Sequence, residues 1–155
     1  MKRIVLVLIA SLSIMACKAQ TKKMDKRKEV AQRYYEILDS GNVEKMNDLL
    51  SEHLIDHDSH GGNAVEEIKG LTLGLKNGFS NATHNLEIVE LIGEDKVFVR
   101  WRMTAKHTGE FFGVPASNKD VNFVGHDLIK VEGGKIVEIW HVENLLSMFE
   151  QMKTE

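Results

Sequence analysis

The fold is decided by three stretches of the chain: KHTGEFFGVP at residues 106–115, GGKIVEIWHVEN at residues 133–144 and LLSMFEQM at residues 145–152. Gly133 and Gly134 can adopt the positive φ that a tight hairpin requires, so the second stretch predicts a turn that leads into a strand. This turn joins two β-branched and apolar runs, Asp120–Val131 and Lys135–Val142, which we expect to pair as antiparallel strands. The third stretch predicts a short C-terminal helix.

Two further strands and three helices are predicted on the N-terminal side of these stretches. The runs Asn85–Ile92 and Lys96–His107 are separated by Gly-Glu-Asp at residues 93–95, which is typical of a hairpin. Apolar residues at helical spacing predict helices at Lys28–Asp39, Val43–Leu50 and Ala64 to about Lys76. We therefore expect an α+β fold in which a cone-like, curved antiparallel sheet of about four strands packs against three N-terminal helices. The apolar interior of such a cone is a natural pocket for a small molecule.

The same stretches, together with IDHD at residues 55–58 and FVRW at residues 98–101, resemble in order and spacing the SnoaL-like polyketide (ester) cyclases of the nuclear transport factor 2-like superfamily. The resemblance covers residues 28 to about 153. It implies acid/base chemistry, an intramolecular aldol closure, that needs neither metal nor cofactor. It also implies a homodimer formed through the sheet face that the helices leave uncovered.

One position departs from the family pattern. The resemblance places Asn144, four residues after Trp140, where the cyclases carry their acid/base aspartate. An amide cannot accept and return a proton near neutral pH, whereas a carboxylate can. If Trp140 and Asn144 face into the cone, strand alternation turns His141 and Glu143 away from it.

Two functions stay open on this basis. The domain binds a small apolar or carbonyl-bearing molecule and performs cyclase-like or isomerase-like chemistry on it, or it is a non-catalytic binding or assembly module that has lost the cyclase aspartate. For the first function the catalytic candidates are His57, His126 and Asn144. An imidazole titrates near neutral pH, and Asn144 would polarise a carbonyl by hydrogen bonding. The candidates for substrate binding are Trp101, His107, Phe112 and Trp140, with a structural role as the alternative for His57 and His107.

Histidines and aspartates are dense between the second and third helices. His53, His57 and His60, with Asp56 and Asp58, offer imidazole and carboxylate ligands of the kind that bind zinc. Their spacing matches no established ligand motif. We therefore predict no metal and no cofactor, and keep a metal-dependent site here as the lesser alternative.

The N-terminus has the features of an export signal. Lys2 and Arg3 precede an apolar run that is too short for a transmembrane helix, which needs about 20 residues. Residues 1–17 are predicted to be a lipoprotein-type signal peptide whose Cys17 becomes lipidated, and residues 18–27 a tether to the domain at residues 28–155. An ordinary cleaved signal is the alternative. The prediction is an exported protein, anchored to a membrane of the bacterial cell envelope.

The composition bounds the remaining partners and chemistry. Cys17 is the single cysteine of 155 residues, so the chain forms no intramolecular disulfide, and lipidation leaves no thiol for catalysis. The net charge of −3 at pH 7 argues against nucleic acid as a partner. The expected partners are a small-molecule ligand, a membrane and a second copy of the chain.

Overall fold

The computed structural model describes residues 24–59 and 61–153. The predicted signal peptide, with Cys17, and most of the predicted tether lie outside the described residues. Among the helices of the described ranges, none is long and apolar enough to cross a membrane. Export and lipid anchoring therefore stay predictions.

The helices begin and end at local capping signals. Helix α1, Lys26–Ser40, begins two residues earlier than predicted, because the side chain of Asp25 accepts a hydrogen bond from the amide of Arg27. It ends at Gly41, whose φ of 71° allows its amide to reach the carbonyl groups of the last turn. Helix α3, Ala64–Gly78, begins at Asn63, whose side chain accepts from the amide of Glu66.

The segment predicted as the second helix, Val43–Leu50, holds only two short helical turns and ends where a strand begins. A 3-10 turn, η1 (Val43–Lys45), and one helical turn, α2 (Met46–Leu49), are followed by strand β1, Leu50–Asp56. Strand β1 was not predicted, because most of its side chains are polar and partly or fully exposed. Its partner is the distant strand β5, Lys135–Glu143, to which it pairs in parallel.

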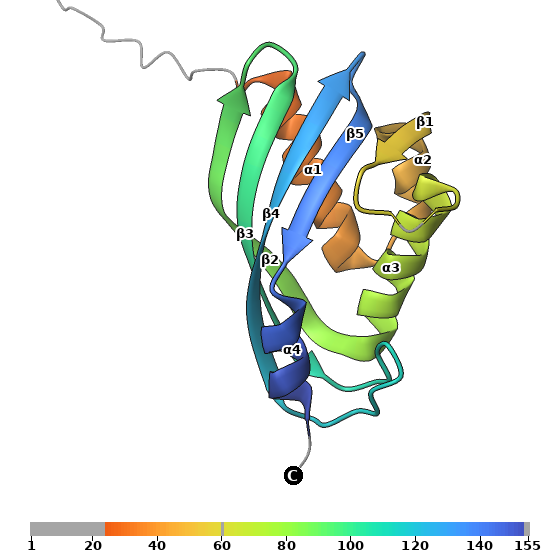
Figure 1. Cartoon of the computed structure of the whole chain (residues 1–155), viewed down its shortest axis with the longest axis vertical. Coiled ribbons are helices and arrows are strands. Elements are labelled where there is room, and N and C mark those ends of the chain that lie inside the picture. The colour runs from red at the N-terminus through yellow and green to blue at the C-terminus, as the bar shows by residue number, and fades with distance from the viewer. Residues whose placement is uncertain (1–23, 60, 154–155) are drawn as a thin grey trace, which may run out of the picture.

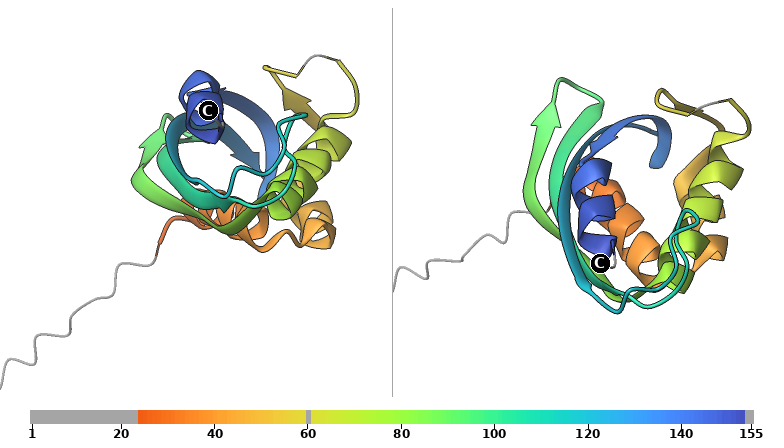
Figure 2. Two further views of the ribbon diagram at one scale, coloured as in Figure 1. Left: turned by 90° about the horizontal axis from the view of Figure 1, so that it is seen from below. Right: turned by 60° about the horizontal axis from the view of Figure 1, so that its bottom comes forward.

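Five strands form one curved, mixed sheet in the order β1-β5-β4-β3-β2. The four strands that the sequence predicted make its antiparallel part: β2 (Phe79–Ile92), β3 (Lys96–His107), β4 (Asp120–Glu132) and β5. Figure 1 shows these long strands side by side, with α1 crossing behind them and α3 next to β1. In Figure 2 the sheet curls around an interior, and α3 faces it from the other side. Helix α4, Leu145–Met152, follows β5 and packs against β4.

The inner face of the sheet is apolar because inward and outward side chains alternate along β3 and β4. Val97, Val99, Met103 and Ile129 are fully buried there. This face supplies one wall of the core, and α1 and α3 supply the other.

A bulge in β5 reverses the alternation that the sequence suggested. Val131 pairs with Ile136 but Lys130 pairs with Glu138, so Val137 is an extra residue in β5. Beyond this bulge the odd-numbered residues of β5 face the interior. His141 and Glu143 therefore point inward, and Trp140 lies on the outer face, opposite to the prediction.

Candidate active site

A cavity of about 600 Å³ lies between the inner face of the sheet, α1 and α3. Cavities of this size hold small organic ligands. Most of its wall is aliphatic or aromatic: Leu38, Ile68, Leu71, Leu75, Trp101, Met103, Phe111, Phe112, Phe123, Ile139, Leu145 and Met148. The cavity thus suits a ligand with an apolar body.

Asp127 of β4 is the buried polar group of this cavity and is only 4 % exposed. Its Oδ2 accepts hydrogen bonds from the Tyr35 hydroxyl and from Nε1 of Trp101, the latter at 3.2 Å. Its Oδ1 is buried and has no hydrogen-bond partner among the described residues. Burial raises the pKa of Asp127 to about 6, because the charged form is poorly solvated there. A carboxyl group with this pKa can both accept and return a proton near neutral pH.

Gly125 makes this arrangement sterically feasible. It pairs with Trp101 across β3 and β4, and a Cβ atom at position 125 would lie 2.2 Å from Cζ2 of the indole. Only glycine therefore lets the indole lie across β4. Asp127 is two residues further along the same face, so Nε1 of Trp101 reaches its carboxylate.

A second polar group surrounds His141 of β5. Its Nδ1 lies 2.8 Å from Oε1 of Glu143, and its Nε2 lies 3.1 Å from Oδ1 of Asp56. The backbone amide of His141 donates to Oδ2 of Asp58 at 2.7 Å. The hydrogen bond to Glu143 is the main cause that raises the pKa of His141 to about 9. The imidazole is therefore a cation at neutral pH, and both of its N–H groups donate to carboxylates.

Of the residues predicted to bind substrate, Trp101 and Phe112 line the cavity. Phe112 and Gly113 form a tight turn between Phe111 and Val114, whose amides and carbonyls bond to each other. The turn gives Phe112 a φ of 47°, a conformation that is strained for an aromatic residue. Phe112 is nonetheless 65 % exposed, and it lines the cavity. An exposed ring in a strained conformation gives the fold little stability, which favours a role in contacting ligand.

We expect Phe112→Asn to stabilise the domain and to weaken ligand binding. Asparagine adopts positive φ with less strain, so the free energy of unfolding should rise by about 1 kcal/mol. The loss of the ring should weaken binding of an aromatic ligand about fivefold or more. Urea denaturation and calorimetric titration measure the two effects. Phe112→Leu is the matched control, because it keeps the backbone strain and loses the ring. If Phe112→Leu and Phe112→Asn both bind the ligand as tightly as the natural chain does, the ring is not a ligand contact.

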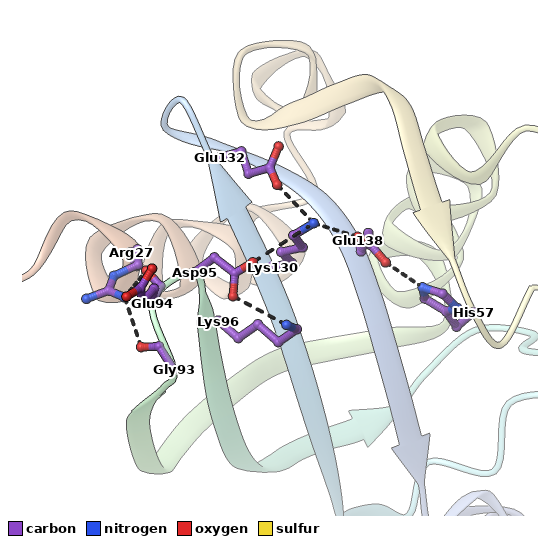
Figure 3. Close-up of polar contacts among 9 residues, drawn as sticks. All are labelled: Arg27, His57, Gly93, Glu94, Asp95, Lys96, Lys130, Glu132 and Glu138. Atoms are coloured by element: carbon purple, nitrogen blue, oxygen red, sulfur yellow. Dashed lines mark hydrogen bonds and ion pairs between the residues drawn. The ribbon is translucent and has the colours of Figure 1, made fainter.

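His57 and Trp140 do not line the cavity. Their rings stack at 4.1 Å, and Nε2 of His57 lies 2.9 Å from Oε2 of Glu138. Lys130 bonds the other carboxylate oxygen of Glu138 at 2.9 Å, as Figure 3 shows. The bulge at Val137 is the physical reason, because it places the even-numbered residues of β5 on the outer face.

His126 and His107 are also outside the cavity lining. His126 is an outward residue of β4, and its Nε2 accepts a hydrogen bond from Nη1 of Arg100 at 2.6 Å. His107 is fully buried at the end of β3, where its Nδ1 accepts from the amide of Ser117 and its ring packs against Phe79. Both histidines were predicted to face the pocket. His126 lies on the outward side of β4 and His107 lies at the end of β3, so neither lines the cavity.

Asn144 caps a helix and does not line the cavity. It is the N-cap of α4, and its Oδ1 accepts from the amide of Ser147 at 3.2 Å. The backbone amide of Asn144 donates to the carbonyl of Val124 on β4. The side chain of Asn144 is therefore occupied in holding the start of α4.

We expect Asn144→Asp to leave both stability and activity close to those of the natural chain. Aspartate and asparagine cap helices about equally well, and a carboxylate here would remain bonded to Ser147. Asn144→Ala should lower the free energy of unfolding by about 1 kcal/mol. Chemical denaturation of the two variants checks this pair. A new catalytic activity in Asn144→Asp would show instead that position 144 takes part in the chemistry.

The described residues bring one potential metal-ligand set together, and it differs from the histidine cluster that was kept as the lesser alternative. Ligand atoms of Asp56, Asp58 and His141 lie within 4.8 Å of one another. Both ring nitrogens of His141 already donate to carboxylates, so a metal would have to displace a proton. His53 is an exposed residue of β1, and His60 lies outside the described residues.

Sequence reasoning missed Asp127, Tyr35 and His141. Asp127 could have been found from the alternation of inward and outward residues along its strand. In DVNFVGHDLIKVE it occupies the same alternating positions as Val121, Phe123 and Ile129, and is the only charged residue on that inward face. A charged residue in an apolar phase is rarely buried without a partner or a function.

The fold and the cavity define the class of protein. An α+β domain in which a curved, mixed five-stranded sheet and four helices enclose an apolar cavity is nuclear transport factor 2-like. The model of the SnoaL-like polyketide cyclase family matches residues 28–152. The chain therefore belongs to the SnoaL-like polyketide cyclase family.

Solved structures agree with this fold. A Bacillus cereus protein, provisionally assigned as a polyketide cyclase, is 26% identical, with a TM-score of 0.70 over 82% of this chain and 80% of that chain. TsrD from Streptomyces laurentii is 15% identical, with a TM-score of 0.74 over 84% and 98% of the two chains. A SnoaL-like polyketide cyclase from Agrobacterium tumefaciens is 14% identical, with a TM-score of 0.67 over 84% and 100%. A search of curated proteins finds no match.

Proposed function

We propose that the domain binds a small, largely apolar, carbonyl-bearing molecule and transfers a proton on it, in cyclase-like or isomerase-like chemistry without a cofactor. Asp127 carries this proposal. Its free Oδ1 is buried at an apolar cavity, and its pKa of about 6 suits a group that both takes and returns a proton near neutral pH. Asp127 here replaces His57, His126 and Asn144, which were the candidates from the sequence.

The proposed reaction needs no co-reactant, because Asp127 returns the proton that it takes. Oδ1 of Asp127 takes a proton from a carbon next to a carbonyl, and the electron pair of that C–H bond passes to the carbonyl oxygen as an enolate. In a ring closure the enolate carbon forms a bond to a second carbonyl carbon of the same molecule. Asp127 then returns the proton to the new alkoxide oxygen. The hydrogen bonds from Tyr35 and Trp101 to Oδ2 keep the carboxylate oriented throughout.

The test uses 2-tetralone, an apolar bicyclic ketone with acidic hydrogens next to its carbonyl. The full-length protein in deuterated buffer at neutral pH should exchange these hydrogens for deuterium faster than buffer alone, as followed by proton NMR. His57→Ala and His126→Ala are the matched controls, and we expect both to keep the exchange rate, since neither residue lines the cavity. Loss of exchange in these two variants would move the chemistry to the outer face and contradict the proposal.

A non-catalytic binding module is the second candidate. It is favoured by the two donors on Asp127, which resemble the support of a structural carboxylate. Trp140→Phe leaves Trp101 as the single tryptophan, so its fluorescence reports whether the cavity is occupied. A change in this fluorescence with 2-tetralone, without hydrogen exchange, would support the binding module.

We also propose the exported, membrane-anchored form and the homodimer. The lone Cys17 after an apolar run supports lipidation. The outer face of the sheet supports dimerisation, because Val142 is 69 % exposed there. Detergent partitioning of the natural chain and of Cys17→Ser tests the anchor, and light scattering of the purified protein tests the dimer.

A further inference from the structure

We propose that the molecule bound in this cavity carries a positive charge beside its apolar body, as an organic amine does. The inference rests on the proposed function, since it assigns a ligand class to the same cavity. It comes from the charges on the cavity wall, of which the proton-transfer proposal uses only Asp127.

Acidic side chains far outnumber basic ones on the wall. Six carboxylates line the cavity: Asp56, Asp58, Glu67, Glu110, Asp127 and Glu143. Among the lining residues that the structure describes, none is lysine or arginine. Charges of one sign around a cavity strengthen the electrostatic field inside it, which favours a ligand group of the opposite sign.

The two histidines of the wall do not cancel this charge. The cationic His141 balances one of the two carboxylates that it bonds, Asp56 and Glu143. His84 faces Asp39, a further carboxylate, with 2.6 Å between Nδ1 and Oδ1. The wall therefore stays negative even when both imidazoles are protonated.

A separate observation concerns the hydrogen bonding of Asp127. Oδ1 of Asp127 is buried without a partner, and a buried polar atom without a hydrogen bond costs about 1–3 kcal/mol. An ionised carboxylate only accepts hydrogen bonds, so the group that satisfies Oδ1 must be a donor. An ammonium group offers up to three such donors together with the complementary charge.

The aromatic residues of the wall suit the same ligand class. Trp101 lies beside Asp127, and Phe111 and Phe112 contact each other at 4.5 Å between ring centroids. The faces of aromatic rings attract ammonium groups as well as apolar surface. The cavity thus offers a combined environment for an amine with an aromatic or alicyclic body.

An organic cation fits the site better than a metal ion does. The set of Asp56, Asp58 and His141 is the cavity's potential metal site among the described residues. A metal needs a free lone pair on imidazole, and both nitrogens of His141 donate to carboxylates instead. An ammonium group needs no such change, because it bonds the carboxylate oxygens as they stand.

The experiment compares three probes that share one apolar body and differ in charge. Calorimetric titration of the full-length protein at pH 7 uses 2-naphthylmethylamine, which is a cation, the neutral 2-naphthylmethanol and the anion 2-naphthoate. We expect the amine to bind at least about tenfold more tightly than the alcohol, and the carboxylate to bind at least about tenfold more weakly than the alcohol. The advantage of the amine should shrink at high salt, because salt screens exposed charges.

Variants of two exposed carboxylates of the cavity lining test whether the carboxylates cause the preference for the amine. Asp58→Asn and Glu110→Gln, combined, should remove most of the preference for the amine, measured as the ratio of the dissociation constants of the alcohol and the amine. Glu44→Gln neutralises an exposed carboxylate outside the cavity lining and is the matched control, with no expected change.

The outcomes separate this inference from the proposed function. If the alcohol binds as well as the amine, or the carboxylate binds best, the inference is overturned and the proposed function stands. If none of the three binds, the inference is overturned, and the hydrogen exchange of 2-tetralone decides the proposed function separately. Titration with Zn²⁺ or Mg²⁺ alone is the last arm: binding that Asp58→Asn abolishes, with no preference for the amine, would assign the acidic wall to a metal and overturn the inference.

Discussion

Asp127→Asn is expected to slow hydrogen exchange of 2-tetralone by about 10²–10⁴-fold, the range that a general acid/base contributes. The amide keeps an oxygen that can accept from Tyr35 and Trp101, so the cavity should keep its shape and its affinity for ligand. The amide cannot take a proton, so only the chemical step is lost. NMR exchange rates and calorimetric affinities, measured on the same preparation, separate the two effects. An exchange rate within about threefold of the natural chain would remove Asp127 from the mechanism.

The pH dependence gives an independent check of the same residue. The exchange rate of the natural chain should rise as pH increases through about 6, where Asp127 ionises, and this rise should be absent in Asp127→Asn. Stability should follow the opposite course. The folded pKa of about 6 exceeds the unfolded value of 3.8, so the native state binds the proton more tightly. The contribution of Asp127 to stability is therefore complete below about pH 4 and is lost as pH rises through about 6.

Asp127→Asn should consequently be more stable than the natural chain at pH 7, by up to about 3 kcal/mol, and should differ little from it near pH 4. Urea denaturation at the two pH values measures this difference. A variant that is both inactive and more stable is the pattern expected for a group held ionised in a buried site for function. A variant that is less stable at both pH values would show that Asp127 has a structural role.

Gly125→Ala is expected to lower the free energy of unfolding by about 3 kcal/mol, although alanine is otherwise tolerated at least as well as glycine in a strand. The new Cβ atom would lie 2.2 Å from Cζ2 and 2.6 Å from Cε2 of Trp101, so the indole must move. Any such movement takes Nε1 away from Asp127, and we expect the exchange rate to fall as well. Chemical denaturation and the exchange assay measure the two losses.

Two variants test the cause of the Gly125→Ala effect. Gly70→Ala, in the middle of α3, adds a Cβ atom with no other atom within 4 Å and should raise stability by about 1 kcal/mol. Trp101→Leu removes the indole that the Cβ atom would meet. In the Trp101→Leu background, Gly125→Ala should cost much less than in the natural chain. Equal costs in both backgrounds would show that the clash with Trp101 is not the cause.

The extent of sequence prediction differs between the fold and the site. The bounds Lys96–His107 of β3 were predicted correctly, and so was the C-terminal helix, because both follow from local patterns between clear turn signals. At the site, Trp101 and Phe112 were placed at the cavity, while His57, His126 and Asn144 were expected there and lie elsewhere. Their positions depend on strand phase and on a helix cap, which the neighbouring residues alone did not reveal.

Local sequence patterns were enough to predict the α+β class, the antiparallel strands and their hairpins, because the apolar period and the turn residues lie within a few positions of each other. The acidic side of the cavity, in contrast, arises from contacts between distant segments. Strand β1 pairs with β5 across more than 80 positions of sequence, and this pairing brings Asp56 to His141. One extra residue, Val137, then turns His141 and Glu143 inward and Trp140 outward. Long-range pairing and a bulge leave no periodic trace in the sequence, because both are settled by packing between segments that are distant along the chain.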